Sequence, residues 1–521
     1  MGDITCLFVL TNACEISSAD RLNQGSCMYQ SSSVNEQTQL FGLSPDQLVM
    51  LVLFSFTLFR TLVLFISPLG LGVDEAQYWL WSQSPDFGYF TKPPLIAWII
   101  GISHALFGHN EAAVRLPASW LHFAAALALW QSTAWLYGKS AGRLTALIWI
   151  TLPAVGLGSF VISTDTPLLL AVSMALLALA AGATERISAA RAMLLAGTAL
   201  GVGILAKYAA VYALFGMTLI WASGRHSDRP LILGKYLLLA LATALIAASP
   251  NLVWNLAHDF ATFRHLGDNA NIAKQSNDLF GSINFLASQA AVAGPIVFLL
   301  MIGILPATRY DVRAAWLAWM AMPALLLITF QAYFSDANAN WAVAAYPALS
   351  IWLGGWMAGN GAPSRTRRWL TVSAIGVNLT ISLAILTICA AGSLGPIAPK
   401  SDPLRRLRGW DQLAKDLAPE LAKHNTHRII ADRRATAALL YWHLYPSTVE
   451  VMVHDKDGIP RNHFEANHSW KPHPENAVLG LSDTPEPPTI PAIKWQDNPT
   501  ESNVDISHNR KRRYFIFHGT E

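Results

Sequence analysis

The sequence predicts a mainly α-helical protein with many transmembrane helices, followed by a C-terminal α/β domain outside the membrane. Of the 521 residues, 53% are hydrophobic and only 13% are charged, which excludes an ordinary soluble enzyme. The last 129 positions nevertheless hold 33 charged residues, so a polar tail follows an apolar body. We therefore expect a polar, disordered N-terminal leader (1–47), a membrane domain (48–392) and a soluble domain (393–521).

Apolar stretches near the length of a transmembrane helix recur from residue 48 to residue 392. A helix needs about 20 residues to cross the hydrocarbon core, and eleven stretches approach this length. Residues 93–107 are too short, and we interpret them as an interfacial or re-entrant segment. The predicted spans are 48–67, 113–136, 143–161, 166–183, 192–206, 209–222, 231–250, 281–305, 314–332, 341–358 and 369–392.

Basic residues mark one face of this array. They occupy alternate short loops, which the positive-inside rule assigns to the cytoplasm. An odd number of spans then leaves the C-terminal domain outside, and we expect a multi-pass protein of the inner (plasma) membrane whose site and C-terminal domain face the periplasm. The basic loops contain Lys139 with Arg143, Arg186 with Arg191, Arg225 with Arg229, Arg309 with Arg313, and Arg365 with Arg367 and Arg368.

Nucleic acid is not an expected partner. The net charge is only +3, far below that of a nucleic-acid-binding surface. The run Arg510–Arg513 is locally basic, and we interpret it as a solvated surface patch.

The first external loop is the most informative segment. Asp74 and Glu75 follow the first span, and Tyr89 and Lys92 precede two prolines. The carboxylates could supply a general base or a metal ligand, the aromatic rings a surface on which a sugar stacks, and the lysine a partner for a phosphate. Boundary acids and interfacial aromatics can equally be structural, so the loop alone leaves both interpretations open.

Further loops on the same side carry polar groups. Asp165 is either a helix N-cap or a second acid of the same cavity. Lys207, followed by Tyr208, is either a snorkelling boundary lysine or a partner for a lipid phosphate. The remaining candidate residues are Asn255, His258, Arg264, His265 and Asn340.

In this order the segments resemble the GT-C fold of integral-membrane glycosyltransferases that use lipid-phosphate sugars. The most similar branch comprises bacterial relatives of the protein O-mannosyltransferases (glycosyltransferase family 39) and the lipid A aminoarabinose transferases. The motifs that carry the resemblance are Asp74-Glu75-Ala-Gln-Tyr78-Trp79, Lys92-Pro93-Pro94, Thr164-Asp165-Thr-Pro167, Ala206-Lys207-Tyr208, Trp254-Asn255 and Ala339-Asn340-Trp341.

The resemblance implies roles for three of these residues. Asp74 would act near the acceptor hydroxyl, Asp165 would assist it, and Lys92 would help to hold the lipid phosphate. Thr91 stands where some members carry a metal-binding acid. A divalent cation is therefore left open as a cofactor, and Glu75, His258 and His265 are the residues considered as its ligands.

The expected activity is transfer of a sugar from a polyprenyl-phosphate donor to a hydroxyl or phosphate of an envelope glycolipid or glycan, such as lipid A or core oligosaccharide. Asp74 would take the acceptor proton, and cations would stabilise the leaving phosphate. The expected partners are this donor, the acceptor and membrane lipids. A protein hydroxyl acceptor, as in protein O-mannosyltransferases, is one alternative. A glycolipid transporter or flippase is a lesser one, because transporters keep ionisable groups near mid-membrane.

Overall fold

The structure is a computed structural model that describes residues 42–222, 234–270, 278–309, 311–359, 363–395, 402–472, 477–490, 492–507 and 510–521. The predicted leader lies almost entirely outside these ranges, as do Arg225 and Arg229. By their contacts, Asp46–Glu521 form one compact unit. The predicted boundary at residue 393 therefore stays a prediction.

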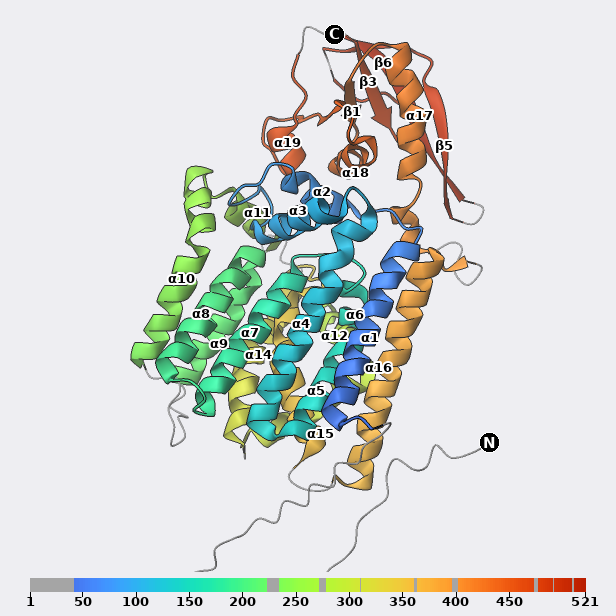
Figure 1. Cartoon of the computed structure of the whole chain (residues 1–521). Helices are drawn as coiled ribbons and strands as arrows, with labels where there is room; N and C mark the ends of the chain where they lie inside the picture. Colours follow the sequence, from blue (N-terminus) through green and yellow to red (C-terminus); the bar gives the residue numbers. More distant parts are fainter. Residues whose placement is uncertain are drawn as a thin grey trace, which may run out of the picture. The chain divides into compact units, whose positions relative to one another are not determined.

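Helices dominate the chain before residue 395 (Figure 1). They are α1 (Pro45–Ile66), α2 (Val73–Ser82), α3 (Leu95–Phe107), α4 (Glu111–Tyr137), α5 (Lys139–Thr151), α6 (Pro153–Gly158), α7 (Asp165–Ala183), α8 (Ala189–Ala206), η2 (Tyr208–Ala210), α9 (Val211–Ala222), α10 (Gly234–Ala257), α11 (Ala261–Ala270), α12 (Leu279–Ala293), α13 (Pro295–Gly303), η4 (Leu305–Arg309), α14 (Val312–Phe334), η5 (Ala339–Ala345), α15 (Tyr346–Ala358) and α16 (Arg365–Ala391). Small residues permit close packing: a Cβ at Gly197 or Gly201 of α8 would collide with the backbone of α10.

The predicted count of eleven spans is not confirmed by length and composition. Among the described residues, seven helices are long and apolar enough to cross a membrane, or eight if the bent pair α12 and α13 is one span. The other three predicted spans coincide with shorter or interrupted helices. Segment 143–161 is divided at Pro153, whose ring cannot continue the helical hydrogen bonds. Helix α9 has only 12 residues, and α15 follows the 3-10 turn η5.

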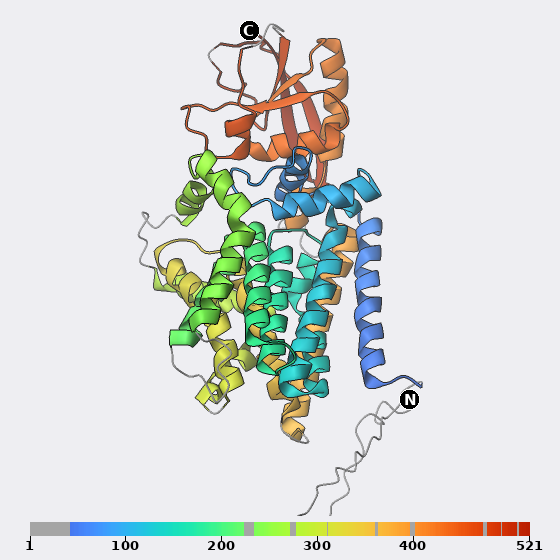
Figure 2. The same ribbon diagram turned by 60° about the vertical axis from the view of Figure 1, so that its left-hand side comes forward.

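The two ends of the bundle differ in the loops they present. The connections α4–α5, α7–α8 and α15–α16 carry predicted basic residues and lie at the end opposite residues 402–521, which we name the C-terminal region (Figure 1). Helices α2 and α3 lie across the other end, beneath that region (Figure 2). This position agrees with the interfacial interpretation of residues 93–107.

The C-terminal region contains a mixed sheet with helices packed against it. Its elements are η7 (Pro403–Leu407), α17 (Trp410–Lys423), β1 (Arg428–Ala431), α18 (Arg434–Leu444), β2 (Glu450–Val453), α19 (His463–Asn467), β3 (Ala477–Ser482), β4 (Lys494–Trp495), β5 (Thr500–Ser507) and β6 (Arg510–Thr520). The strand order is β2-β1-β3-β6-β4, and β5 also pairs with β6. Strand β1 runs parallel to β2 and β3, whereas β6 is antiparallel to β3. Helix α17 buries Leu413, Leu417 and Leu421, spaced four residues apart on one face.

One apolar core runs from α2 into the C-terminal region. Trp79 of α2 and Trp442 of α18 are both buried, and their rings meet edge to face with centroids 4.9 Å apart. Leu439 of α18 and Leu479 of β3 belong to the same core. This shared packing holds the beginning of α18 close to the beginning of α2, where the predicted acids lie.

Candidate active site

Glu75 is buried, and both of its carboxylate oxygens accept hydrogen bonds from neighbouring residues. Arg115 of α4 donates from Nη2 to Glu75 Oε2 at 2.7 Å and from Nε to Oε1 at 2.9 Å, and these side chains are 1% and 2% exposed, respectively. The backbone N–H groups of Gly72 and Ile162 donate to the same carboxylate at 2.8 Å and 3.1 Å. Glu75 therefore ties the start of α2 to α4. These contacts enclose its carboxylate, and the catalytic or metal-binding role expected for Glu75 stays a prediction.

Asp74 faces the C-terminal region instead. Its side chain is 63% exposed, and its Oδ1 accepts a hydrogen bond from Arg434 Nη2 at 3.1 Å. Arg434 also donates to Gln77 Oε1 at 3.0 Å, so one arginine of α18 bridges two positions on α2. An exposed carboxylate held in this way can take a proton from an approaching hydroxyl. The sequence analysis did not predict Arg434, which begins α18 three positions after the end of β1.

Asp165 is the first residue of α7 and holds two side chains. Its Oδ1 accepts a hydrogen bond from Lys207 Nζ at 2.5 Å, and its Oδ2 accepts one from Asn340 Nδ2 at 2.7 Å. Lys207 directly follows α8, and Asn340 lies in η5. The side chain of Asp165 thus joins three predicted residues from three parts of the chain. A carboxylate at a helix N-terminus is also favoured by the helix dipole.

Asp74 and Asp165 act on the same neighbours. Burial and the charge of Lys207 lower the pKa of Lys92, and the two carboxylates oppose this shift. Burial, followed by Asp74 and Asp165, raises the pKa of Tyr78. Coulombic effects decline with distance. Both acids and Lys207 therefore influence the charge of Lys92.

A pocket of about 450 Å³ adjoins the two lysines. Lys92, Lys207 and Tyr208 lie in its wall. Most of the remaining wall is apolar or aromatic, and it includes Val211, Tyr212, Phe263, Leu266, Ile328 and Trp341. Ammonium groups beside an apolar wall suit a phosphate that carries a hydrocarbon chain.

Two predicted binding residues are buried and make structural contacts. Asn255 is fully buried, and its Nδ2 donates to the Tyr208 hydroxyl at 3.2 Å while that hydroxyl donates to Asn251 Oδ1 at 2.8 Å. The buried Tyr89 ring stacks on Trp81 at 4.6 Å, and its hydroxyl donates to the Trp81 carbonyl at 3.0 Å. Asn255 therefore positions Tyr208, and Tyr89 braces the first loop.

The predicted metal ligands are not brought together. The His258 ring stacks on Trp254 at 4.0 Å, whereas His265 lines the 450 Å³ pocket and Glu75 is enclosed with its arginine. Arg264, the predicted cation of this loop, is exposed on α11. Within the described ranges, no three His, Cys, Asp or Glu side chains are grouped so that they could hold a metal ion.

Comparisons with known proteins agree with this architecture. Residues 91–254 match the family model described as dolichyl-phosphate-mannose-protein mannosyltransferase. The lipid A galacturonosyltransferase RgtD of Rhizobium johnstonii is 34% identical over 473 residues, which cover 88% of this chain and 96% of RgtD. An undecaprenyl phosphate-alpha-4-amino-4-deoxy-L-arabinose arabinosyl transferase of Erwinia tasmaniensis is 29% identical over 176 residues, 33% of this chain and 32% of the relative. The crystal structure of ArnT from Cupriavidus metallidurans bound to undecaprenyl phosphate has a TM-score of 0.62 at 17% identity, covering 91% of this chain and 97% of ArnT. The ArnT likeness confirms the predicted fold class.

Proposed function

Because the chain belongs to the membrane glycosyltransferase family that includes the Rhizobium johnstonii lipid A galacturonosyltransferase, we propose that it transfers a sugar from a polyprenyl-phosphate donor to lipid A or a related envelope glycolipid. The observation that carries this proposal is the pairing of an exposed acid with a lysine-lined apolar pocket. Asp74 provides the acid, and Lys92 and Lys207 provide the cations.

The donor occupies the 450 Å³ pocket in this proposal. Its phosphate lies against Lys92 and Lys207, and the first isoprene units lie against the apolar wall. As the sugar departs, negative charge builds on the phosphate, and pre-positioned cations stabilise that charge. Asp165 and Asn340 keep the Lys207 ammonium in place. The fold neighbour ArnT, captured with undecaprenyl phosphate, supports this class of donor.

Asp74 serves as the general base. Its carboxylate takes the acceptor hydroxyl proton while the hydroxyl oxygen attacks the anomeric carbon, and the bond from that carbon to the phosphate oxygen breaks. Polyprenyl phosphate leaves, and one displacement inverts the anomeric configuration. Arg434 positions Asp74 through the 3.1 Å ion pair.

The reaction takes place on the periplasmic side of the inner membrane. The charged site and the C-terminal region lie at the end of the bundle opposite the basic connections (Figure 1). The positive-inside rule gives those connections to the cytoplasm. Polyprenyl-linked donors suit this side, because they arrive through the bilayer and no soluble nucleotide sugar is required.

Mass spectrometry of the envelope tests the proposal. Lipid A, core glycan and polyprenyl-phosphate sugars are compared between cells with the gene intact, deleted, and restored. The expected result is loss of one sugar unit from lipid A or core and accumulation of its lipid-linked donor. Unchanged glycolipids together with a lost protein glycan would support the alternative of a protein acceptor, which the family-model match over residues 91–254 motivates. Lipid A, core glycan and polyprenyl-phosphate sugar profiles that are all unchanged by the deletion would contradict the proposed function.

Lys92→Met should weaken donor binding. Removing the ammonium is expected to raise the donor KM by about 10- to 100-fold, the usual effect of losing one charge-assisted contact. Because burial lowers the pKa of Lys92, this side chain loses its proton at a lower pH than an ordinary lysine does. The wild-type donor KM should therefore rise at alkaline pH, and the variant should lose this dependence. Lys423→Met, at an exposed position of α17, is the control. An unchanged donor KM in Lys92→Met would remove this lysine from the donor site.

A further inference from the structure

A second pocket, of about 510 Å³, is lined mainly by cations. Val73, the residue before Asp74, forms part of its wall. Six of its ten lining residues are lysine or arginine, and none is acidic. We name these six the basic pocket residues: Arg405, Arg406, Arg433, Arg510, Lys511 and Arg512.

Packed aromatic residues hold part of this pocket in place. The Arg512 guanidinium lies over the Trp410 ring at 5.1 Å and donates to the Arg405 carbonyl at 3.4 Å. Trp410 Nε1 in turn donates to the Arg406 carbonyl at 2.9 Å. Trp410 is only 5% exposed, so the cations stand on a fixed support. Three residues of the basic run at Arg510–Arg513, namely Arg510, Lys511 and Arg512, therefore line a cavity, and Arg510 and Lys511 are exposed as predicted.

Some of this charge is balanced locally. Arg433 pairs with Asp483 at 3.0 Å and lies 3.5 Å from Asp432. The other cations of the pocket come from η7 and the beginning of β6, segments that are far apart in the sequence. Like charges repel when they converge on one cavity. An anion bound there would relieve that repulsion.

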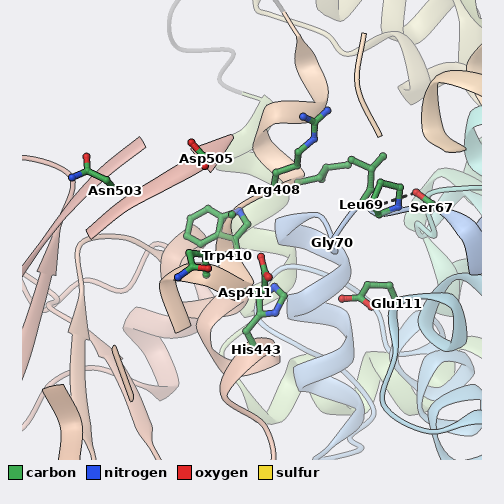
Figure 3. A pocket seen from close by; sticks show the side chains of 14 residues that line it. Ser67, Leu69, Gly70, Glu111, Arg408, Trp410, Asp411, His443, Asn503 and Asp505 are labelled. Carbon is green, nitrogen blue, oxygen red and sulfur yellow. Dashed lines mark hydrogen bonds between the residues drawn. The ribbon is translucent and has the colours of Figure 1, made fainter. Parts of the chain in front are cut away.

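Trp410 also borders a second cavity with a different charge. This pocket of about 570 Å³ is lined by Glu111, Asp411 and Asp505 together with His443 and one cation, Arg408 (Figure 3). The acids outnumber the single arginine in this pocket, whereas the 510 Å³ pocket has six cations and no acid in its wall. An anionic group is therefore attracted more strongly to the pocket that contains Val73.

We propose that the basic pocket binds an anionic group of the glycolipid acceptor, a phosphate or a sugar carboxylate, and so brings the acceptor hydroxyl to Asp74. This inference rests on the proposed function. Arginine guanidinium groups match phosphate and carboxylate oxygens in a fork geometry. Two wall residues of the pocket are sequence neighbours of the proposed base and its partner. Val73 precedes Asp74, and Arg433 precedes Arg434, which pairs with Asp74.

Acceptor kinetics of the full-length enzyme in nanodiscs test this proposal. The double variant Arg406→Gln/Lys511→Gln changes two exposed cations of the pocket. At saturating donor, we expect the acceptor KM to rise about 10-fold or more and kcat to stay within about twofold, because each lost charge-assisted contact weakens binding. Lys423→Gln/Lys456→Gln, which removes two cations outside the pocket, should leave both values unchanged. The acceptor probe is lipid A extracted from the deletion strain.

A second arm identifies the bound group. The same lipid A is treated with phosphatase, or its carboxylates are methylated, and the treatment that removes the bound anion should abolish the KM difference between wild type and variant. An unchanged acceptor KM in the double variant, or a difference that survives both treatments, would overturn the proposal. A variant that loses only its dependence on anionic phospholipid in the nanodisc would also overturn it, because the pocket would then bind bilayer lipid. Absence of any transfer by the wild type would count against the proposed function itself.

Discussion

Asp74→Asn is expected to lower kcat/KM for sugar transfer by about 10²- to 10⁴-fold, the usual contribution of a general base. The amide has nearly the same shape as the carboxylate but cannot take the acceptor proton at neutral pH. The folded protein should keep its stability, because the Asp74 side chain is 63% exposed and its pair with Arg434 is partly solvated. Transfer from a purified lipid-linked donor measures the loss.

Two further variants make this test specific. Asp457→Asn removes an exposed carboxylate from the C-terminal region and should retain full activity. Asp74→Glu should recover part of the lost rate, because it restores a carboxylate at a displaced position. Near-normal turnover by Asp74→Asn would remove Asp74 from the mechanism. Loss of membrane insertion in that variant would instead assign it a structural role.

Glu75→Gln is expected to destabilise the protein by about 3–5 kcal/mol, because it leaves the Arg115 guanidinium buried without its counter-charge. The pair is 1% and 2% exposed, so water cannot replace the lost partner. The measurement is the rate of irreversible heat inactivation of the detergent-solubilised enzyme, compared with Asp74→Asn. These neighbouring carboxylates should thus differ: one loss impairs chemistry and the other impairs folding.

A double variant separates these roles. Glu75→Gln/Arg115→Met should be more stable than the sum of the single changes predicts, because neither charge is then left alone. If Glu75→Gln instead kept its stability and lost transfer activity, the structural role of Glu75 would be wrong.

The sequence predicted the parts of the fold that depend on local pattern. Apolar length indicated a membrane protein, and alternating basic loops indicated its two faces. Short or broken spans were less predictable, since Pro153 divides a helix without shortening the apolar stretch. Measured by helix length, eleven predicted spans therefore became seven or eight among the residues described.

The candidate site was predictable where its residues come from loops on the same predicted side of the membrane. Asp165, Lys207 and Asn340 were singled out from their loops, and the structure joins them directly. Arg434 could not be found this way, because it lies 360 positions from Asp74 and meets it only through packing of the C-terminal region. The sequence could not distinguish Glu75 from Asp74, because adjacent residues on a helix point in different directions: Glu75 points toward Arg115 of α4 and Asp74 toward Arg434 of α18.

The edge-to-face contact of Trp79 and Trp442 bears on how this enzyme could be re-engineered. Since one apolar core joins α2 to α18, the helix that carries the proposed base Asp74 and the region that supplies Arg434 form a single module. Chimaeras between relatives should therefore exchange α2 and the C-terminal region together. Exchanging either piece alone would set two unmatched surfaces against each other and displace the base from its arginine.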